Sequence, residues 1–258
     1  MAKDDLISRS ARFCLAAQGQ LTDTPATRRV HALEQQLNIA VLTATDENAR
    51  RWSDRLKTVV VESAAPRWPA MSIQLHVQSW RTPLTGTYDE IHVVGASALA
   101  MELHEELAAH TALLSLHCIW PHKAPSGFSW NAEEDLAAFL ANLFTALSGK
   151  AYLGLLWDDY RLHHQQAGLR RGTVTQSEHW SALLQEVDRL VGASSSATSA
   201  LLFLDGQQLT IGEFAQAYGV LERTLPATCL ISVGTLPSQE QRYGFSLLLT
   251  TPERAVSA

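Results

Sequence analysis

Apolar and polar positions form blocks along the chain that are typical of an α/β protein. Short apolar runs recur from Leu37 to Trp157, and amphipathic segments with helical spacing separate most of them. The predicted strands of this part are Leu37–Thr43, Thr58–Glu62, Met71–Trp80, Glu90–Val94, Ala112–Trp120 and Ala151–Trp157. This order favours a mainly parallel sheet with right-handed crossovers and helices on both faces. Met71–Trp80 alternates apolar and polar residues, which indicates a half-exposed strand near an edge.

The C-terminal stretch has the clearest pattern of elements. Ala200–Leu204 is an apolar run closed by a glycine turn, and Thr210 with Glu213 forms a capping box that starts a helix. Cys229–Leu236 and Tyr243–Thr250 follow as two more strand-like runs. We therefore predict a smaller βαββ unit at this end of the chain.

The one low-complexity stretch, Gly192–Ser199, resembles a linker because it consists of Gly, Ala, Ser and Thr only. It suggests three parts. They are an N-terminal helical extension at residues 1–36, a Rossmann-like α/β domain at 37–191 and the C-terminal βαββ unit at 199–258.

Composition narrows the function classes. The 258 residues carry a formal net charge of −6, which argues against a nucleic-acid-binding surface. Three cysteines, Cys14, Cys118 and Cys229, lie far apart without a C-x-x-C pair, so we expect a cytoplasmic protein without disulfides. No apolar run approaches the roughly 20 residues of a membrane-spanning helix.

Two short stretches are candidates for ligand chemistry. Gly95-Ala96-Ser97 lies between a predicted strand and a predicted helix, where a helix N-terminus holds an anion, although a plain turn needs the same residues. Asp158-Asp159 follows the predicted strand Ala151–Trp157, where carboxylates bind a metal or a base edge, or cap the next helix.

Other catalytic patterns are absent from the sequence. His104 and His110 are six residues apart, so they do not share one helical face as zinc ligands would, and we predict no metal site. Ser97 lacks the second glycine of a G-x-S-x-G nucleophile turn. We therefore predict no catalytic residue.

The order of elements from Leu202 to Thr251 resembles the C-terminal domain of the tubulin/FtsZ family. The matching features are Gly206, Leu209-Thr210, Glu213, the strand reaching Gly234 and the last strand ending near Thr250. Upstream, Met101–Pro121 is similar to the helix and strand after the family's glycine-rich phosphate loop. Leu153–Asp159 resembles the family's strand that ends beside the guanine.

The departures from the family pattern concern nucleotide chemistry. The turn that would hold the phosphates has the single glycine Gly95, and Thr43-Ala44-Thr45-Asp46 has none, whereas close approach to phosphate needs several glycines. The resemblance therefore implies a shortened, degenerate relative that has lost GTP hydrolysis. The candidate nucleotide-binding residues that remain are Gly95, Ala96, Ser97, Asp158 and Asp159.

Two functions fit these observations. The first is a non-catalytic tubulin/FtsZ-like protein without a cofactor that self-associates or binds a partner protein, as a scaffold of a bacterial assembly. The alternative is a small-molecule transferase that uses a nucleotide or nucleoside cofactor at the Gly95/Asp158 end of the sheet. The first predicts no GTP turnover, and the second predicts a polar pocket to which Ser97 and Asp158 both contribute.

Overall fold

The computed structural model describes residues 36–61, 71–95, 106–119, 127–206, 209–238 and 241–252, all within the unit Gln36–Ala258. Residues 1–35 of the predicted N-terminal extension, Ala96 and Ser97 lie outside the described residues. The strands are β1 (Gln36–Thr43), β2 (Ser72–Ser79), β3 (Tyr88–Val94), β4 (Thr111–Ile119), β5 (Phe128–Trp130), β6 (Leu169–Ser177), β7 (Ser199–Gly206), β8 (Leu230–Pro237) and β9 (Tyr243–Thr251). The helices are α2 (Asp46–Val61), α4 (Glu133–Leu147), α5 (Trp157–Gln165), α6 (Trp180–Gly192) and α7 (Ile211–Thr224).

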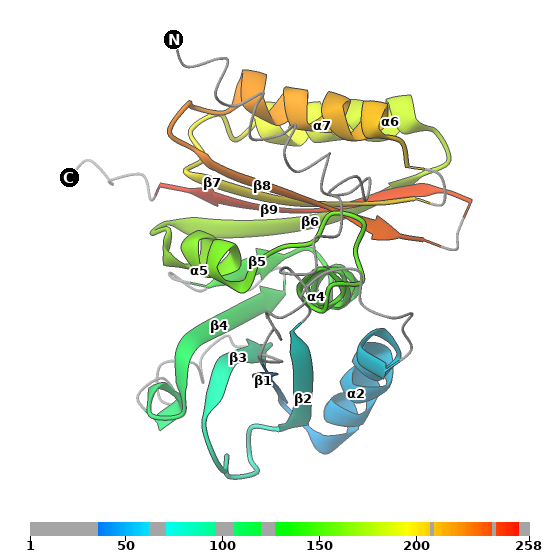
Figure 1. The fold of residues 1–258 in the computed structure, drawn as a ribbon. Coiled ribbons are helices and arrows are strands. Elements are labelled where there is room, and N and C mark those ends of the chain that lie inside the picture. The colour runs from blue at the N-terminus through cyan, green and yellow to red at the C-terminus, as the bar shows by residue number, and fades with distance from the viewer. Residues whose placement is uncertain are drawn as a thin grey trace, which may run out of the picture. The chain divides into compact units, whose positions relative to one another are not determined.

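All nine described strands belong to one sheet, in the order β2-β1-β3-β4-β5-β6-β9-β7-β8 (Figure 1). Every neighbouring pair is parallel except the two that involve β9. This confirms the predicted α/β class with a mainly parallel sheet. β2 is an edge strand, as its alternating sequence pattern predicts. The pattern alternates because the apolar side chains of β2 pack on one face of the sheet only.

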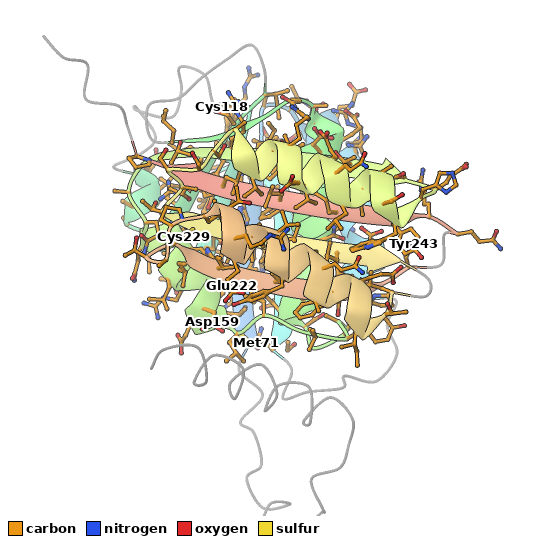
Figure 2. All side chains as sticks on the ribbon, turned by 90° about the horizontal axis from the view of Figure 1, so that it is seen from above. Met71, Cys118, Asp159, Glu222, Cys229 and Tyr243 are labelled. Atoms are coloured by element: carbon orange, nitrogen blue, oxygen red, sulfur yellow. The ribbon has the colours of Figure 1, made fainter. Side chains whose placement is uncertain are left out.

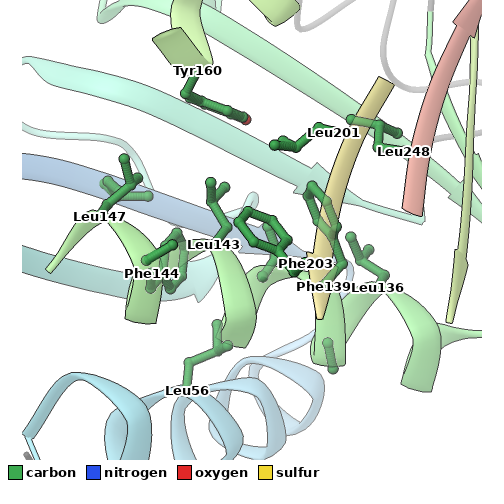
Figure 3. Close-up of a cluster of buried hydrophobic side chains, with 14 of the residues drawn as sticks. Leu56, Leu136, Phe139, Leu143, Phe144, Leu147, Tyr160, Leu201, Phe203 and Leu248 are labelled. Carbon is green, nitrogen blue, oxygen red and sulfur yellow. The ribbon is translucent and has the colours of Figure 1, made fainter. Parts of the chain in front are cut away.

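Two layers of helices cover the sheet. α2, α4 and α5 lie on one face, where α4 contributes more buried residues to the core than any other element. Phe139 of α4 packs against Phe203 of β7 with ring centroids 5.8 Å apart (Figure 3). On the other face, α6 and α7 lie side by side over the C-terminal strands (Figure 2). Their buried residues include Leu183, Val187 and Leu221, which lie at helical spacing along each helix.

Several sequence predictions are wrong, each for a local reason. Thr58–Val61 continues helix α2, because a short β-branched run cannot be told from a helical segment by its periodicity. Ala151–Trp157 forms no strand; only Leu153 makes an isolated antiparallel bridge, to Thr235 of β8. The strand β6 and the helix α5 are polar segments that the apolar pattern did not reveal.

The Ser-rich stretch 192–199 forms an ordered, hydrogen-bonded turn. The backbone N–H of Ala197 donates to the carbonyl of Ser194 at 2.8 Å, and Thr198 donates to Thr250 of β9 at 2.8 Å. The Ala197 side chain is buried. The division at residues 192–199 stays a prediction, and β6 before the turn pairs with β9 after it.

Candidate functional site

The sheet has a topological switch point between β1 and β3, the place where open α/β sheets bind ligands. Gly95 follows the carboxyl end of β3 with φ of 80°, a conformation that favours glycine. Its N–H donates to the carbonyl of His117 on β4 at 2.9 Å. The positive φ therefore serves a turn that is tied to the neighbouring strand.

On the β1 side of this switch point, the turn before α2 satisfies its own backbone. Thr45 Oγ1 accepts the N–H of Asn48 at 3.2 Å, and the Oγ1–H of Thr43 donates to the carbonyl of Thr45 at 3.0 Å. Asp46 and Glu47 occupy the first turn of α2. A phosphate placed there would meet two carboxylates and a capped helix end, so this turn disfavours an anionic ligand.

Asp158 and Asp159 lie in the first turn of α5 instead of at the end of a strand. The Asp158 side chain is 87% exposed and lies 3.6 Å from Arg161 on the next turn. Partial burial and the neighbouring Asp158 raise the pKa of Asp159. Their position complements the positive end of the α5 dipole, as first-turn acids do in many helices. Asp158 therefore has a local role that requires no ligand.

The densest polar chemistry lies in the middle of the sheet, on the face covered by α4 and α5. Parallel register brings side chains of β3, β4, β5 and β6 to this face, and α5 closes over them. The members of this buried polar cluster are Glu90, His92, Ser115, His117, Trp130, Tyr160, His164 and Arg170. Six of the eight side chains, those of Glu90, His92, Ser115, His117, Trp130 and Tyr160, are at most 2% exposed.

One half of the cluster is a chain of nitrogen donors. Trp130 Nε1–H donates to His117 Nδ1 at 3.0 Å, and His117 Nε2 lies 3.0 Å from His92 Nδ1. His92 Nε2 in turn lies 3.4 Å from Glu90 Oε2. The two imidazole rings stack at 5.2 Å, and Phe144 of α4 packs against His92.

The other half holds α5 against the sheet. The hydroxyls of Ser115 and Tyr160 donate to Glu90 Oε1 at 2.6 and 2.8 Å, and His164 Nε2 lies 2.9 Å from Ser115 Oγ. Arg170 of β6 donates to the carbonyls of His164 and Gln166, so a cation stabilises the C-terminal end of α5. α5 is thus fixed at its middle and at its end by polar contacts.

Burial shifts the ionisation of these groups strongly. It raises the pKa of Glu90 to about 7, against the opposing hydrogen bonds from Ser115 and Tyr160. It lowers the pKa of His92 to about 3 and that of His164 to about 4, and it lowers the pKa of His117 well below its usual value. The three histidines are therefore neutral at pH 7, and Glu90 is the one group of this cluster that titrates near neutrality.

A second buried histidine pins α5 to the C-terminal strands. His163 Nδ1 lies 2.6 Å from Ser199 Oγ of β7, and Nε2 lies 2.8 Å from Ser232 Oγ of β8. Burial lowers the pKa of His163 to about 4. The neighbouring histidines His163 and His164 thus contact strands from β4 to β8.

The segment before and along α5 also exposes apolar side chains. Tyr152, Leu156 and Leu162 are 42%, 61% and 46% exposed, and only Leu169 and Ile211 are comparably exposed large apolar residues in the described ranges. We call Tyr152, Leu156 and Leu162 the apolar segment. Among the described residues, no group of three or more His, Cys, Asp or Glu side chains is arranged to hold a metal ion, and no helix is long and apolar enough to cross a membrane.

With this geometry, the class of the protein follows from its topology: an α/β protein with a tubulin/FtsZ-like fold. A mutant FtsZ from M. jannaschii has a TM-score of 0.56 and 12% identity, covering 89% of this chain and 96% of that one. CetZ from Methanosaeta thermophila strain DSM 6194 has a TM-score of 0.52 and 12% identity, covering 84% and 87%. No protein-family model and no curated protein matches the chain.

Proposed function

We propose that this chain is a non-catalytic protein of tubulin/FtsZ-like fold that acts by self-association, or by binding a partner protein, without a nucleotide cofactor. The observation that carries the proposal is the turn between β1 and α2. In this turn the N–H of Asn48 donates to Thr45 Oγ1, so it is not free for a ligand. Asp46 and Glu47 place negative charge at the switch point, where phosphates would lie.

The apolar segment supports self-association. Three large apolar side chains exposed within eleven residues favour a contact surface, because burial of each would stabilise an interface by about 1 kcal/mol or more. An FtsZ of M. jannaschii that is 12% identical, with a TM-score of 0.55, is described as a dimer and empty. A protein with this type of fold is thus described as a dimer in an empty form.

The test is light scattering of the full chain over a range of concentrations, together with thermal shift and turnover measurements. We expect a concentration-dependent increase in mass for the native chain and a monomer for Leu156→Glu. Ile211→Glu is the matched control, since Ile211 is equally exposed, at 60%, on α7. We also expect no shift of melting temperature with GTP.

Three outcomes would contradict the proposal. A monomer at every concentration removes self-association, GTP turnover removes the non-catalytic role, and a melting shift with S-adenosylmethionine alone favours the transferase alternative. For the partner-binding form of the proposal, the affinity of the native chain for a purified partner would be compared with that of Leu156→Glu.

A further inference from the structure

The sheet ends at β8, and one half of this edge is open. Among the described strands, β8 pairs with β7 alone. Its C-terminal half is covered at Thr235, whose N–H donates to the carbonyl of Leu153 at 3.0 Å and whose carbonyl accepts the N–H of Tyr152 at 2.8 Å. Residues 230–233 pair with β7 on one side, and no described strand lies on their other side.

Two printed bonds fix the direction of the backbone groups along this edge. The N–H of Leu230 donates inward, to the carbonyl of Thr198 just before β7, at 3.0 Å, whereas both backbone groups of Thr235 point outward. Successive residues of a strand direct their backbone groups to alternate sides. Ile231 and Val233 therefore present their N–H and C=O groups outward, as Thr235 does, while their side chains pack in the cluster under α6 and α7.

The sequence of the open half does not protect it from pairing. Natural edge strands avoid association with charged side chains, proline or a bulge. Residues 229–233, Cys-Leu-Ile-Ser-Val, include no charge and no proline, and the register with β7 runs unbroken from Leu230 to Pro237. Ile231 and Val233 are β-branched, which favours an extended strand. By contrast, the other half is covered by Leu153 and ends in a proline.

We propose that β8 pairs antiparallel with β8 of a second copy of this chain, which continues the sheet across a two-fold axis at Ser232. Ile231 of each copy then lies opposite Val233 of the other, and these two pairs form about four N–H···O=C bonds. The inference rests on the proposed function and deepens it, because it names the strand through which the chain self-associates. A two-fold contact uses the same surface of both copies, so the product is a dimer.

The helix layer supplies apolar contacts on one face of this pairing. α6 packs on β6 and β9 and α7 packs on β8, so α7 is the outer helix. Gln216 accepts the N–H of Trp180 of α6 at 2.7 Å, which marks the inner side of α7. Tyr218, two residues further, lies on the outer side, and its ring stacks on Phe214 at 6.3 Å. Neighbouring helices on a sheet lie about 10 Å apart, so α7 of one copy meets α7 of the other.

The apolar segment flanks the pairing on the α5 face. Leu153 runs antiparallel to β8 at its bridge to Thr235, so the residues after it lead toward the open half, and the exposed Leu156 follows in that direction. Pairing of a few residues buries far less than the about 800 Å² per partner of a standard interface. Leu156 and the outer side of α7 supply further apolar area. Ile211 lies at the start of α7, beside the covered end of β8 at Pro237, so it stays a control position.

The experiment is residue-resolved amide hydrogen exchange of the native full chain at low and high concentration, with light scattering of the same samples. In a sample that is about nine-tenths dimer, exchange at Ile231 and Val233 should slow about tenfold, because only the free chain exchanges. The amides of Leu230 and Thr235 are internal controls, since they are bonded within one copy and should change little. Association without slowing at Ile231 and Val233 would overturn the β8 pairing and leave the proposed function intact, whereas a monomer at every concentration would refute both.

Val233→Pro tests the same pairing by substitution. It removes an outward N–H and leaves the bonds between β8 and β7 in place, so we expect a folded monomer. Leu230→Pro is the matched control: it removes the N–H that donates to Thr198, and we expect it to lower the melting temperature more than Val233→Pro does. A folded Val233→Pro chain that dimerises like the native chain would overturn the proposal. If neither variant folds, the exchange measurement decides, because it needs no substitution.

Discussion

An indole N–H can only donate, so Trp130 requires His117 Nδ1 to accept and places the proton of His117 on Nε2. His117 then donates to His92 Nδ1, which leaves the proton of His92 on Nε2, facing Glu90 Oε2. This hydrogen-bond direction can be tested through the coupling of two substitutions. Glu90→Gln replaces Oε2 by an amide N–H that faces the Nε2–H of His92, so two donors oppose each other at a separation of about 3.4 Å. Trp130→Phe removes the indole N–H and allows His117 and His92 to exchange tautomers. The second substitution should therefore relieve a conflict that the first creates.

The magnitudes can be set from the structure. Glu90→Gln also removes the cost of burying a carboxylate whose pKa lies at about 7 instead of 4.5, about 3 kcal/mol at high pH, so its effect alone has no fixed sign. Trp130→Phe costs on the order of 1–3 kcal/mol because the indole is 2% exposed and packs on Phe139. The coupling free energy between the two substitutions does have a defined sign. One pair of opposed buried donors destabilises the folded state by about 1–2 kcal/mol, and the second substitution relieves this cost.

The assay is urea denaturation of the native chain, both single variants and the double variant at pH 8, where Glu90 is mostly ionised. We expect Trp130→Phe to cost about 1–2 kcal/mol less in the Glu90→Gln background than in the native chain. Additive costs, within about 0.5 kcal/mol, would show that His117 and His92 are not oriented by the indole and would refute the reasoning.

Two further outcomes follow from single positions. Gly172→Ala would place a Cβ 2.0 Å from the Trp130 ring, so we expect a loss of about 3 kcal/mol or more in unfolding free energy. Gly192→Ala is the control, because a Cβ there has nothing within 4 Å, and it should be neutral or slightly stabilising. Equal melting temperatures for the two variants would contradict this expectation. Burial lowers the pKa of His163 to about 4, so its contribution, up to about 3 kcal/mol, is present above pH 6.5 and is lost as pH falls from 6.5 to 4. His163→Gln should make the melting temperature less dependent on pH over this window, and an unchanged slope would show that Ser199 and Ser232 do not hold a neutral imidazole.

Most of the sheet could be predicted because its strands are covered on both faces. β1, β7 and β9 read as continuous apolar runs for this reason, and the capping box at Thr210 marks the start of α7 with both of its hydrogen bonds formed. β6 escaped prediction because its positions include Arg170, Arg171 and Gln176. It is held instead by its backbone pairing with β9 and by the close approach of Trp130 to Gly172.

The apolar run Ala151–Trp157 was misleading for the opposite reason. A buried strand and an exposed apolar segment have the same composition, and periodicity does not separate them. Here Ala151 and Leu155 are buried, whereas Tyr152 and Leu156 remain on the surface. The run Ala151–Trp157, which the sequence pattern predicts as a strand beside a nucleotide, thus contains two of the exposed residues of the proposed contact surface, Tyr152 and Leu156.

The polar cluster left one signal in the sequence, the pairs Glu90-x-His92 and Ser115-x-His117 inside two predicted strands. A spacing of two puts each pair on one face of the sheet, and polar pairs in a covered strand are unusual. What the sequence could not supply is the partner, because Tyr160 and His164 lie on a helix with few apolar positions and reach Glu90 and Ser115 across 70 and 49 residues.

The location of this cluster bears on what the fold does. Ligand chemistry in α/β sheets gathers at the carboxyl ends of strands, yet here that end at β1 is capped and acidic, and the ionisable groups lie in mid-sheet. Satisfied buried hydrogen bonds of this kind rigidify a core and specify one arrangement of the elements that they join. In this chain the cluster ties β3 and β4 to α5 and β6, the elements that lead into the C-terminal strands. The hydrogen bonds of Glu90 with Ser115 and Tyr160, and those of Arg170 with the end of α5, thus couple the central strands to the C-terminal part of the sheet.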